Sequence, residues 1–289
     1  MLNVKENPKD TFFLKNKFIN CKGILLNLDE PTIMGILNHT PDSFFDGKLT
    51  FSEAEIIEKT LLMLSNGAKI IDVGGYSSRP NGCEVSEKEE LERTLSVVKL
   101  LVAEFPDIIL SIDTFRSVVA EKCIENGAAI VNDISGGDFD KKMIACVAQL
   151  NVPYILMHSN SKLTDLHKIE TKNKIIEDEI LYFSEKINLF RKKGITDIII
   201  DPGFGFGKTL EQNYYLLNHL ADFHIFELPI LVGISRKSMI NKVLGTTPQQ
   251  ALNGTSVLNT IALLKGASIL RVHDVKEANQ AVKLVAALE

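Results

Sequence analysis

Eight short runs of β-branched and aliphatic residues recur along the chain, and segments with amphipathic helical periodicity lie between them. Strands that alternate with helices in this way are parallel and buried on both faces, which restricts the fold strongly. The runs are Ile33 to Leu37, Ile70 to Val73, Ile108 to Ile112, Ala129 to Val131, Tyr154 to Met157, Ile198 to Ile200, Ile230 to Val232 and Ser268 to Val272. The pattern therefore predicts an α/β fold built around a parallel sheet.

A polar residue stands at or just after the carboxyl end of every run. These residues are Asn38, Asp72, Asp113, Asn132, His158, Asp201, Ser235 and His273. One such residue means little, but eight in series match a (β/α)8 TIM barrel, whose active site forms at the carboxyl ends of the strands. The alternative is an open doubly wound sheet, because the number of strands alone does not prove closure.

The flanking segments indicate a single barrel domain with a short N-terminal β-hairpin. Helices are predicted over 52–66, 87–104 and 117–126, and they end at Gly67, before Pro106 and at Gly127. Residues 18–27, FINCKGILLN, are predicted to form a hairpin that plugs the end of the barrel opposite the polar residues. We expect one domain over 1–289, with an extension and hairpin at 1–28 and the barrel at 29–289.

The composition is that of an ordinary globular protein, 45% hydrophobic and 24% charged, with a formal net charge of −5. This balance argues against a broad nucleic-acid surface, which needs clustered Lys and Arg. No stretch approaches the ~18 apolar residues of a membrane span, so we expect a cytoplasmic protein with no membrane partner. The four cysteines, Cys21, Cys83, Cys123 and Cys146, form no C-x-x-C pair, which favours reduced thiols over a zinc site or a disulfide framework.

The stretch DPGFGFGKT, residues 201–209, has the glycines and the lysine of a phosphate-binding loop but not its spacing. A Walker-type loop requires glycine five residues before Gly207, where Pro202 stands. The dinucleotide pattern, begun at Gly203, requires glycine where Lys208 stands. The glycines instead predict a tight turn after Asp201, and Lys208 is not expected to bind phosphate.

Longer stretches around the strand ends resemble the dihydropteroate synthase family, collinearly and over nearly the whole chain. They are IMGILNHTPDSFFDG (33–47), GAKIIDVGGYSSRPNGCEVSEKEELERT (67–94), LSIDT (110–114), GAAIVNDISGG (127–137), DPGFGFGKT, LVGISRKSMI (231–240) and GASILRVHDV (266–275). The resemblance implies a transferase of folate biosynthesis that joins 6-hydroxymethyl-7,8-dihydropterin diphosphate to 4-aminobenzoate and releases pyrophosphate. It also implies Mg²⁺ as cofactor, a homodimer, and sulfonamides as mimics of aminobenzoate.

The family pattern places the pterin against residues at the strand ends. A pterin presents an amide N–H beside an amino group, and the Asp201 carboxylate can accept from both. By resemblance Asp113 and Asn132 also bind the pterin, and Asp113 is expected to stabilise positive charge as the diphosphate leaves. Lys237, in the SRKS segment, is expected to donate to the pterin carbonyl and a ring nitrogen.

Arg271 and His273 are two residues apart on a predicted strand, so they are expected to point to one side and form an anion site for the diphosphate. Together with Asp113 and Lys237 they are the predicted catalytic residues. Asn38 offers a neutral oxygen at the same mouth. By resemblance Asn38 is the ligand to Mg²⁺, whose other ligands are mostly water and phosphate.

The loops after the first and second strands are predicted to close over the substrates and to complete the aminobenzoate pocket. By resemblance, Ser78 contacts the pterin diphosphate. The residues expected at the aminobenzoate site are Phe44, Arg79, Pro80, Phe206 and Ser238.

Some positions depart from the family's usual pattern, namely His39, Phe45, Lys48 and Ser78. The segment MHSNSKLTDLH after the fifth strand lacks the usual M-H-x-x-G-x-P pattern, so no chemistry is assigned to His158. Two alternatives remain open: a pterin-binding methyltransferase that works with a corrinoid partner, and a catalytically inactive pterin-binding protein. The SRKS segment and the two aminobenzoate loops favour the synthase over the methyltransferase.

Overall fold

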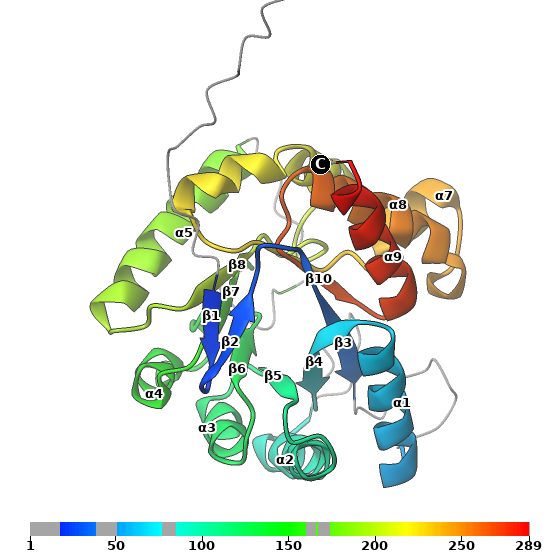
Figure 1. Ribbon diagram of the computed structural model, residues 1–289. Coiled ribbons are helices and arrows are strands. Elements are labelled where there is room, and N and C mark those ends of the chain that lie inside the picture. The colour runs from blue at the N-terminus through cyan, green and yellow to red at the C-terminus, as the bar shows by residue number, and fades with distance from the viewer. Residues whose placement is uncertain (1–17, 39–50, 77–84, 160–165, 167–173, 289) are drawn as a thin grey trace, which may run out of the picture.

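A ring of parallel strands surrounded by helices forms the body of the protein (Figure 1). The computed structural model describes residues 18–38, 51–76, 85–159, 166 and 174–288. The hairpin consists of β1 (Phe18–Cys21) and β2 (Ile24–Asn27). The strands of the ring are β3 (Thr32–Asn38), β4 (Ala68–Gly74), β5 (Ile109–Asp113), β6 (Ile130–Asp133), β7 (Tyr154–Met157), β8 (Ile198–Asp201), β9 (Leu231–Val232) and β10 (Ile269–Val272).

Helices follow the strands and cover the outside of the ring. They are α1 (Glu53–Ser65), α2 (Glu87–Glu104), α3 (Ser117–Glu125), α4 (Met143–Leu150), α5 (Ile175–Lys192), α6 (Leu210–Asn218), α7 (Ser238–Leu244), α8 (Leu252–Leu264) and α9 (Val275–Ala286). Short 3₁₀ helices occur at η2 (Leu220–Phe226) and η3 (Pro248–Gln250). Of the predicted helices, α2 has the expected bounds, and α1 and α3 lie within theirs.

The two edge strands of the sheet meet, so the sheet curls into a barrel. The strand order is β8-β7-β6-β5-β4-β3-β10-β9, and all the paired strands run parallel. At the seam, the Ile200 N–H donates to the Pro229 carbonyl at 3.0 Å, and Ile200 forms a parallel bridge with Ile230. The TIM-barrel prediction is therefore confirmed, and the open doubly wound sheet is excluded.

An apolar layer fills the interior of the barrel and joins it to the hairpin. Each strand contributes one of its members, which are Met34, Ile70, Ile109, Ile130, Ile155, Ile199, Leu231 and Ile269. The hairpin residues Ile19, Cys21 and Leu26 pack into the same cluster. The predicted plug is thus confirmed, and it closes the amino-terminal end of the barrel.

Local signals account for the ends of several elements. Ser52 and Ser86 form capping boxes with Glu55 and Glu89, which satisfy the first free N–H groups of α1 and α2. Gly67 follows α1 with a φ of +103°, a conformation that favours glycine.

No helix within the described residues has the length and apolar character needed to cross a membrane.

Candidate active site

Strand geometry brings the polar strand-end residues into the barrel mouth, directly above the apolar layer. Alternate side chains of a strand point to the same side, so residues two positions after the apolar layer also face the interior. These residues include Asp72, Asn132, Asp201 and Arg271. Asp113 lies four residues after the apolar-layer residue Ile109 of β5, so its side chain points to the same side as that of Ile109. The described mouth therefore contains three carboxylates, an amide and a guanidinium.

Arg271 lies between two carboxylates at the centre of this mouth. Its Nε donates to Asp72 Oδ2 at 2.6 Å, and its Nη2 donates to Asp113 Oδ2 at 2.7 Å. The Asn132 amide donates to the same Asp72 oxygen at 3.0 Å. The structure thus joins Arg271, Asp113 and Asn132, three of the predicted site residues, in one network.

The network is short of positive charge, which shifts its acid–base equilibria. Burial, aided by the charges of Asp72 and Glu90, outweighs the attraction of Arg271 and raises the pKa of the Asp113 carboxyl to about 7. Burial alone would lower the pKa of the Arg271 guanidinium, but Asp72 and Asp113 raise it above its ordinary value. Arg271 is therefore charged at every physiological pH, while Asp113 can hold a proton near neutrality.

Asp201, the last residue of β8, places its carboxylate at the floor of the mouth, directly before the glycine turn. Asp201 is buried, and its Oδ1 accepts from the Gly203 N–H at 2.8 Å. Gly203 has a φ of +71°, and a Cβ there would lie 2.1 Å from the His158 carbonyl oxygen. Only glycine fits so close an approach. Burial raises the pKa of Asp201 despite the nearby Lys237 ammonium.

Lys237 reaches this floor from the turn before α7. Its Nζ donates to the Phe204 carbonyl at 2.5 Å and lies 4.6 Å from the centre of the Phe206 ring. A Cβ on Gly233 would lie 3.9 Å both from Lys237 Nζ and from Arg271 Cβ, so the side chains of these two residues flank this glycine. Burial lowers the pKa of Lys237 to about 8, and attraction to Asp201 limits the shift.

His273 and Arg271 have different partners in the structure. His273 Nδ1 lies 3.1 Å from Ser235 Oγ, and the His273 backbone N–H donates to the same oxygen at 3.2 Å. The Arg271 guanidinium is directed at Asp72 and Asp113 instead. The shared anion site thus stays a prediction that requires the diphosphate to recruit both groups.

Asn38 lies at the same mouth and faces a cavity. A Cβ on Gly74 would lie 3.4 Å from Asn38 Oδ1 and 3.5 Å from Asp113 Cβ, which places Asn38 next to the network. Asn38 and His273 both line a cavity of about 530 Å³ whose walls include residues of α1 and α9. Within the described residues, no group of three or more His, Cys, Asp and Glu side chains offers a ready metal cage. A single neutral oxygen fits a Mg²⁺ ion that keeps mainly phosphate and water ligands.

Of the remaining predicted site residues, some lie in the part of the chain that the structure describes and others lie outside it. Phe206 lies under Lys237, and Ser238 is exposed at the first position of α7. The residues that lie outside the described ranges are the predicted site residues Phe44, Ser78, Arg79 and Pro80 and the unusual positions His39, Phe45 and Lys48.

Asp72 is a site residue for which no sequence motif predicted a role. Its side chain is fully buried, and its Oδ2 holds both Arg271 and Asn132. Its Oδ1 has no hydrogen-bond partner among the described residues. The available signal was its position at the end of the second strand, which matches that of Asn132 and Asp201.

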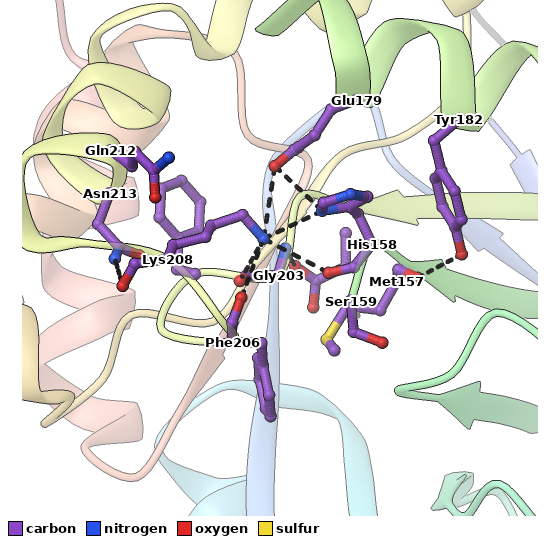
Figure 2. Close-up of polar contacts among 12 residues, drawn as sticks. Met157, His158, Ser159, Glu179, Tyr182, Gly203, Phe206, Lys208, Gln212 and Asn213 are labelled. Atoms are coloured by element: carbon purple, nitrogen blue, oxygen red, sulfur yellow. Dashed lines mark hydrogen bonds and ion pairs between the residues drawn. The ribbon is translucent and has the colours of Figure 1, made fainter. Parts of the chain in front are cut away.

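Lys208 lies outside the strand-end network, in a buried cluster of its own (Figure 2). Its Nζ donates to the Gly203 carbonyl at 3.0 Å and lies 3.4 Å from Glu179 Oε1 on α5. His158 Nδ1 lies 3.1 Å from Lys208 Nζ and 3.2 Å from Glu179 Oε1. These contacts agree with the prediction that Lys208 is no phosphate ligand, and they add Glu179, which the sequence patterns did not indicate.

Comparison with known proteins identifies relatives over nearly the whole chain. A family model described as pterin binding enzyme matches residues 34–273. The dihydropteroate synthase of Escherichia coli K12 is 41% identical over 268 residues, covering 92% of this chain and 94% of the relative. That of Clostridium beijerinckii is 44% identical over 263 residues, covering 89% of this chain and 94% of the relative.

Solved structures give the same result. The Yersinia pestis dihydropteroate synthase in complex with a sulfonamide drug has a TM-score of 0.89 at 40% identity, covering 94% of this chain and 98% of that one. The Xanthomonas albilineans dihydropteroate synthase with 4-aminobenzoic acid has a TM-score of 0.87 at 34% identity, with the same coverage.

Proposed function

Because the chain belongs to the pterin-binding enzyme family, and within it to the dihydropteroate synthases, we propose that its mouth residues condense 6-hydroxymethyl-7,8-dihydropterin diphosphate with 4-aminobenzoate. The observation that carries this proposal is the convergence of Asp201, Lys237, Asn132 and the Arg271 network on one buried floor. A flat heterocycle with donors on one edge and acceptors on another fits such a floor.

Each group has a distinct part in binding the pterin. The Asp201 carboxylate accepts from the amide N–H and the amino group of the ring. The Asn132 amide donates to Asp72, so its Oδ1 serves as the acceptor toward the ligand. The Lys237 ammonium donates to the pterin carbonyl and a ring nitrogen. We assign Ser78 to the pterin diphosphate on family resemblance.

Bond cleavage precedes attack in the mechanism we propose. The bond from the methylene carbon to the diphosphate oxygen breaks, and the pterin ring delocalises the cation while the Asp113 carboxylate stabilises it. Arg271 and His273 bind the departing pyrophosphate. When bound at Asn38, Mg²⁺ would neutralise negative charge on the phosphates of the departing pyrophosphate. The aniline nitrogen of aminobenzoate then bonds to the methylene carbon and loses a proton to solvent, with no strong base required.

The second substrate occupies the side of the floor next to Phe206. Phe206 supplies an apolar face, and Ser238 is placed to hold the aminobenzoate carboxylate. Phe44, Arg79 and Pro80 complete this pocket by resemblance.

The exposed apolar side chains on α7 and α8 support a homodimer, and they include Val243, Leu244, Val257 and Leu264. We further propose a cytoplasmic enzyme with small-molecule substrates and neither nucleic-acid nor membrane partners.

The activity is tested by incubating the purified protein with pterin diphosphate, Mg²⁺ and 4-aminobenzoate. Dihydropteroate and pyrophosphate should appear in equal amounts. Tight pterin binding without either product would instead identify an inactive pterin-binding protein. Methyl transfer from methyltetrahydrofolate to a corrinoid would support the methyltransferase alternative.

Removal of Mg²⁺ should weaken binding of the diphosphate group without changing the affinity for the pterin ring. Addition of EDTA is expected to reduce turnover and the affinity for pterin diphosphate, since Asn38 alone cannot neutralise the phosphates. The affinity for 6-hydroxymethylpterin, which lacks phosphate, should stay unchanged in calorimetry. Equal losses for both ligands would contradict a metal bound through the diphosphate.

The kcat/KM for pterin diphosphate should fall as the pH rises through about 8. The pKa of Lys237 is lowered to about 8, so the free enzyme loses this ammonium donor above that pH. The measurement is the pH profile of kcat/KM between pH 6 and 10. In Lys237→Arg the guanidinium does not titrate in this range, so the fall should disappear even if the overall rate is lower. A variant that keeps the wild-type alkaline limb would show that another group controls it.

A further inference from the structure

The buried Lys208 cluster, defined as Lys208, Glu179 and His158, is not needed by the mechanism above. The Lys208 side chain is 3% exposed, and the Glu179 side chain is fully buried although it projects from a helix on the outside of the barrel. Removing a carboxylate and an ammonium from water is costly unless they are paired and hydrogen-bonded. Stability alone is therefore a weak explanation for the cluster, because replacing a buried ion pair with apolar residues of similar volume is often neutral or stabilising.

The contacts of Lys208 are with the backbone of the turn that presents Asp201. Its Nζ lies 3.0 Å from the Gly203 carbonyl and 3.4 Å from the Phe206 carbonyl. It also lies 3.5 Å from the His158 carbonyl in the segment after β7. Figure 2 shows Lys208 Nζ between the Gly203–Phe206 turn and His158, with Glu179 beyond it. One ammonium therefore joins the segments that follow β7 and β8.

Both peptides that Lys208 holds lead directly to pterin-binding groups. Gly203, whose carbonyl contacts Lys208, gives its N–H to Asp201 Oδ1 at 2.8 Å. Phe206, whose carbonyl also contacts Lys208, places its ring 4.6 Å from Lys237 Nζ. Between them, the Phe204 carbonyl accepts from Lys237. Lys208 thus contacts the same turn whose backbone is hydrogen-bonded to the Asp201 carboxylate and to the Lys237 ammonium.

Glu179 and His158 hold Lys208 from the opposite side. Glu179 Oε1 is 3.4 Å from Lys208 Nζ and 3.2 Å from His158 Nδ1. The His158 ring packs edge-on against Tyr182, with centroids 4.9 Å apart, and the His158 backbone N–H donates to the Asp201 carbonyl at 2.9 Å. The Glu179 carboxylate, which projects from α5, thus lies at ion-pair distance from both Lys208 and His158, and its oxygens accept no hydrogen bond within the described residues.

We propose that Lys208, with Glu179 and His158, is a positioning centre that sets the geometry of the pterin floor without touching the pterin. Lys208 clamps the turn at residues 203–206 to the segment after β7, and Glu179 holds the clamping ammonium in place. The expected change in pterin affinity rests on the proposed function, whereas the expected change in hydrogen exchange of the turn does not.

The test uses full-length variants and separates positioning from general stability. Lys208→Met leaves Glu179 buried without its cation, so thermal stability should fall sharply. The double variant Lys208→Met/Glu179→Gln removes both charges and should recover much of that stability. Its turn should nevertheless stay unclamped, with amide hydrogen exchange at residues 203–207 faster by about 10-fold or more. Its affinity for 6-hydroxymethylpterin should fall about 10- to 100-fold, the cost of losing a charge-assisted tether.

Two comparisons complete the design. Lys122→Met removes an exposed lysine that pairs with Glu125 at 2.8 Å, and it should change neither measurement. If the double variant does not fold, Glu179→Gln alone should show the faster exchange and a several-fold weaker affinity. A folded double variant with wild-type exchange at 203–207 would overturn the inference, whether or not the wild-type protein binds the pterin. Failure of the wild type to bind, with the faster exchange still present in the variant, would count against the proposed function only.

Discussion

Replacing Arg271 with methionine should lower kcat/KM for the condensation by about 10²- to 10³-fold, the usual effect of losing one charged group that stabilises a transition state. Arg271 donates to the Asp113 carboxylate and is also expected to bind the departing pyrophosphate. Its loss further leaves Asp72 and Asp113 buried without a counter-charge. Thermal or chemical unfolding should show a decrease in stability of about 3–5 kcal/mol. Steady-state kinetics and unfolding must therefore be measured on the same preparation.

Arg271→Lys is the matched variant for this prediction. Lysine keeps the charge but cannot donate to Asp72 and Asp113 with the planar fork of a guanidinium. Stability should thus recover in large part, while kcat/KM should remain well below that of the wild type. Full activity in either variant would show that the guanidinium takes no part in the reaction.

Replacing Asp201 with asparagine should weaken binding of 6-hydroxymethylpterin by about 10²-fold or more. The carboxylate is expected to accept two hydrogen bonds from the ring, and each bond to a charged group contributes about 1.5–3 kcal/mol. In the variant an amide NH₂ faces the ring's own donors, so one bond is lost and a repulsive contact appears. Calorimetric titration of the folded variant measures this change directly.

Asparagine is chosen because it preserves the fold of the turn. Asp201 Oδ1 accepts from the Gly203 N–H, and an amide oxygen can accept the same bond. The melting temperature should therefore change little, and a wild-type Kd in the variant would remove Asp201 from the pterin site. Asp197→Asn is a suitable control, since Asp197 precedes the same strand and contacts the backbone N–H of Asn20 in the hairpin.

Most of the barrel was predictable because each strand carries its own signal. The runs at Tyr154 to Met157 and at Ile33 to Leu37 appear as β7 and β3 within one residue at each end. The run at Ile230 to Val232 is only two residues long as β9, since Ile230 contributes an isolated bridge across the seam. Closure could not be predicted from strand number, because it depends on the contact between the β8 and β9 ends.

The candidate site was predictable to the extent that strand position determines it. Asp113, Asn132, Asp201 and Arg271 follow from the ends of their strands and from the two-residue period of a strand. Partner choice was not predictable in the same way. Arg271 on β10 contacts Asp72 on β4 and Asp113 on β5 across the interior of the closed barrel, while His273 contacts Ser235.

The amino-acid sequence was sufficient to predict which side chains point into the mouth and which turn requires glycine. Both properties are local: alternation is built into a strand, and the turn at Gly203 has a φ of +71°, a conformation that favours glycine. The partners of the lysine in DPGFGFGKT depend instead on how distant segments pack. Glu179 lies 29 residues before Lys208 on a helix with no motif, and only the packing of α5 on the barrel brings its carboxylate to within 3.4 Å of that ammonium.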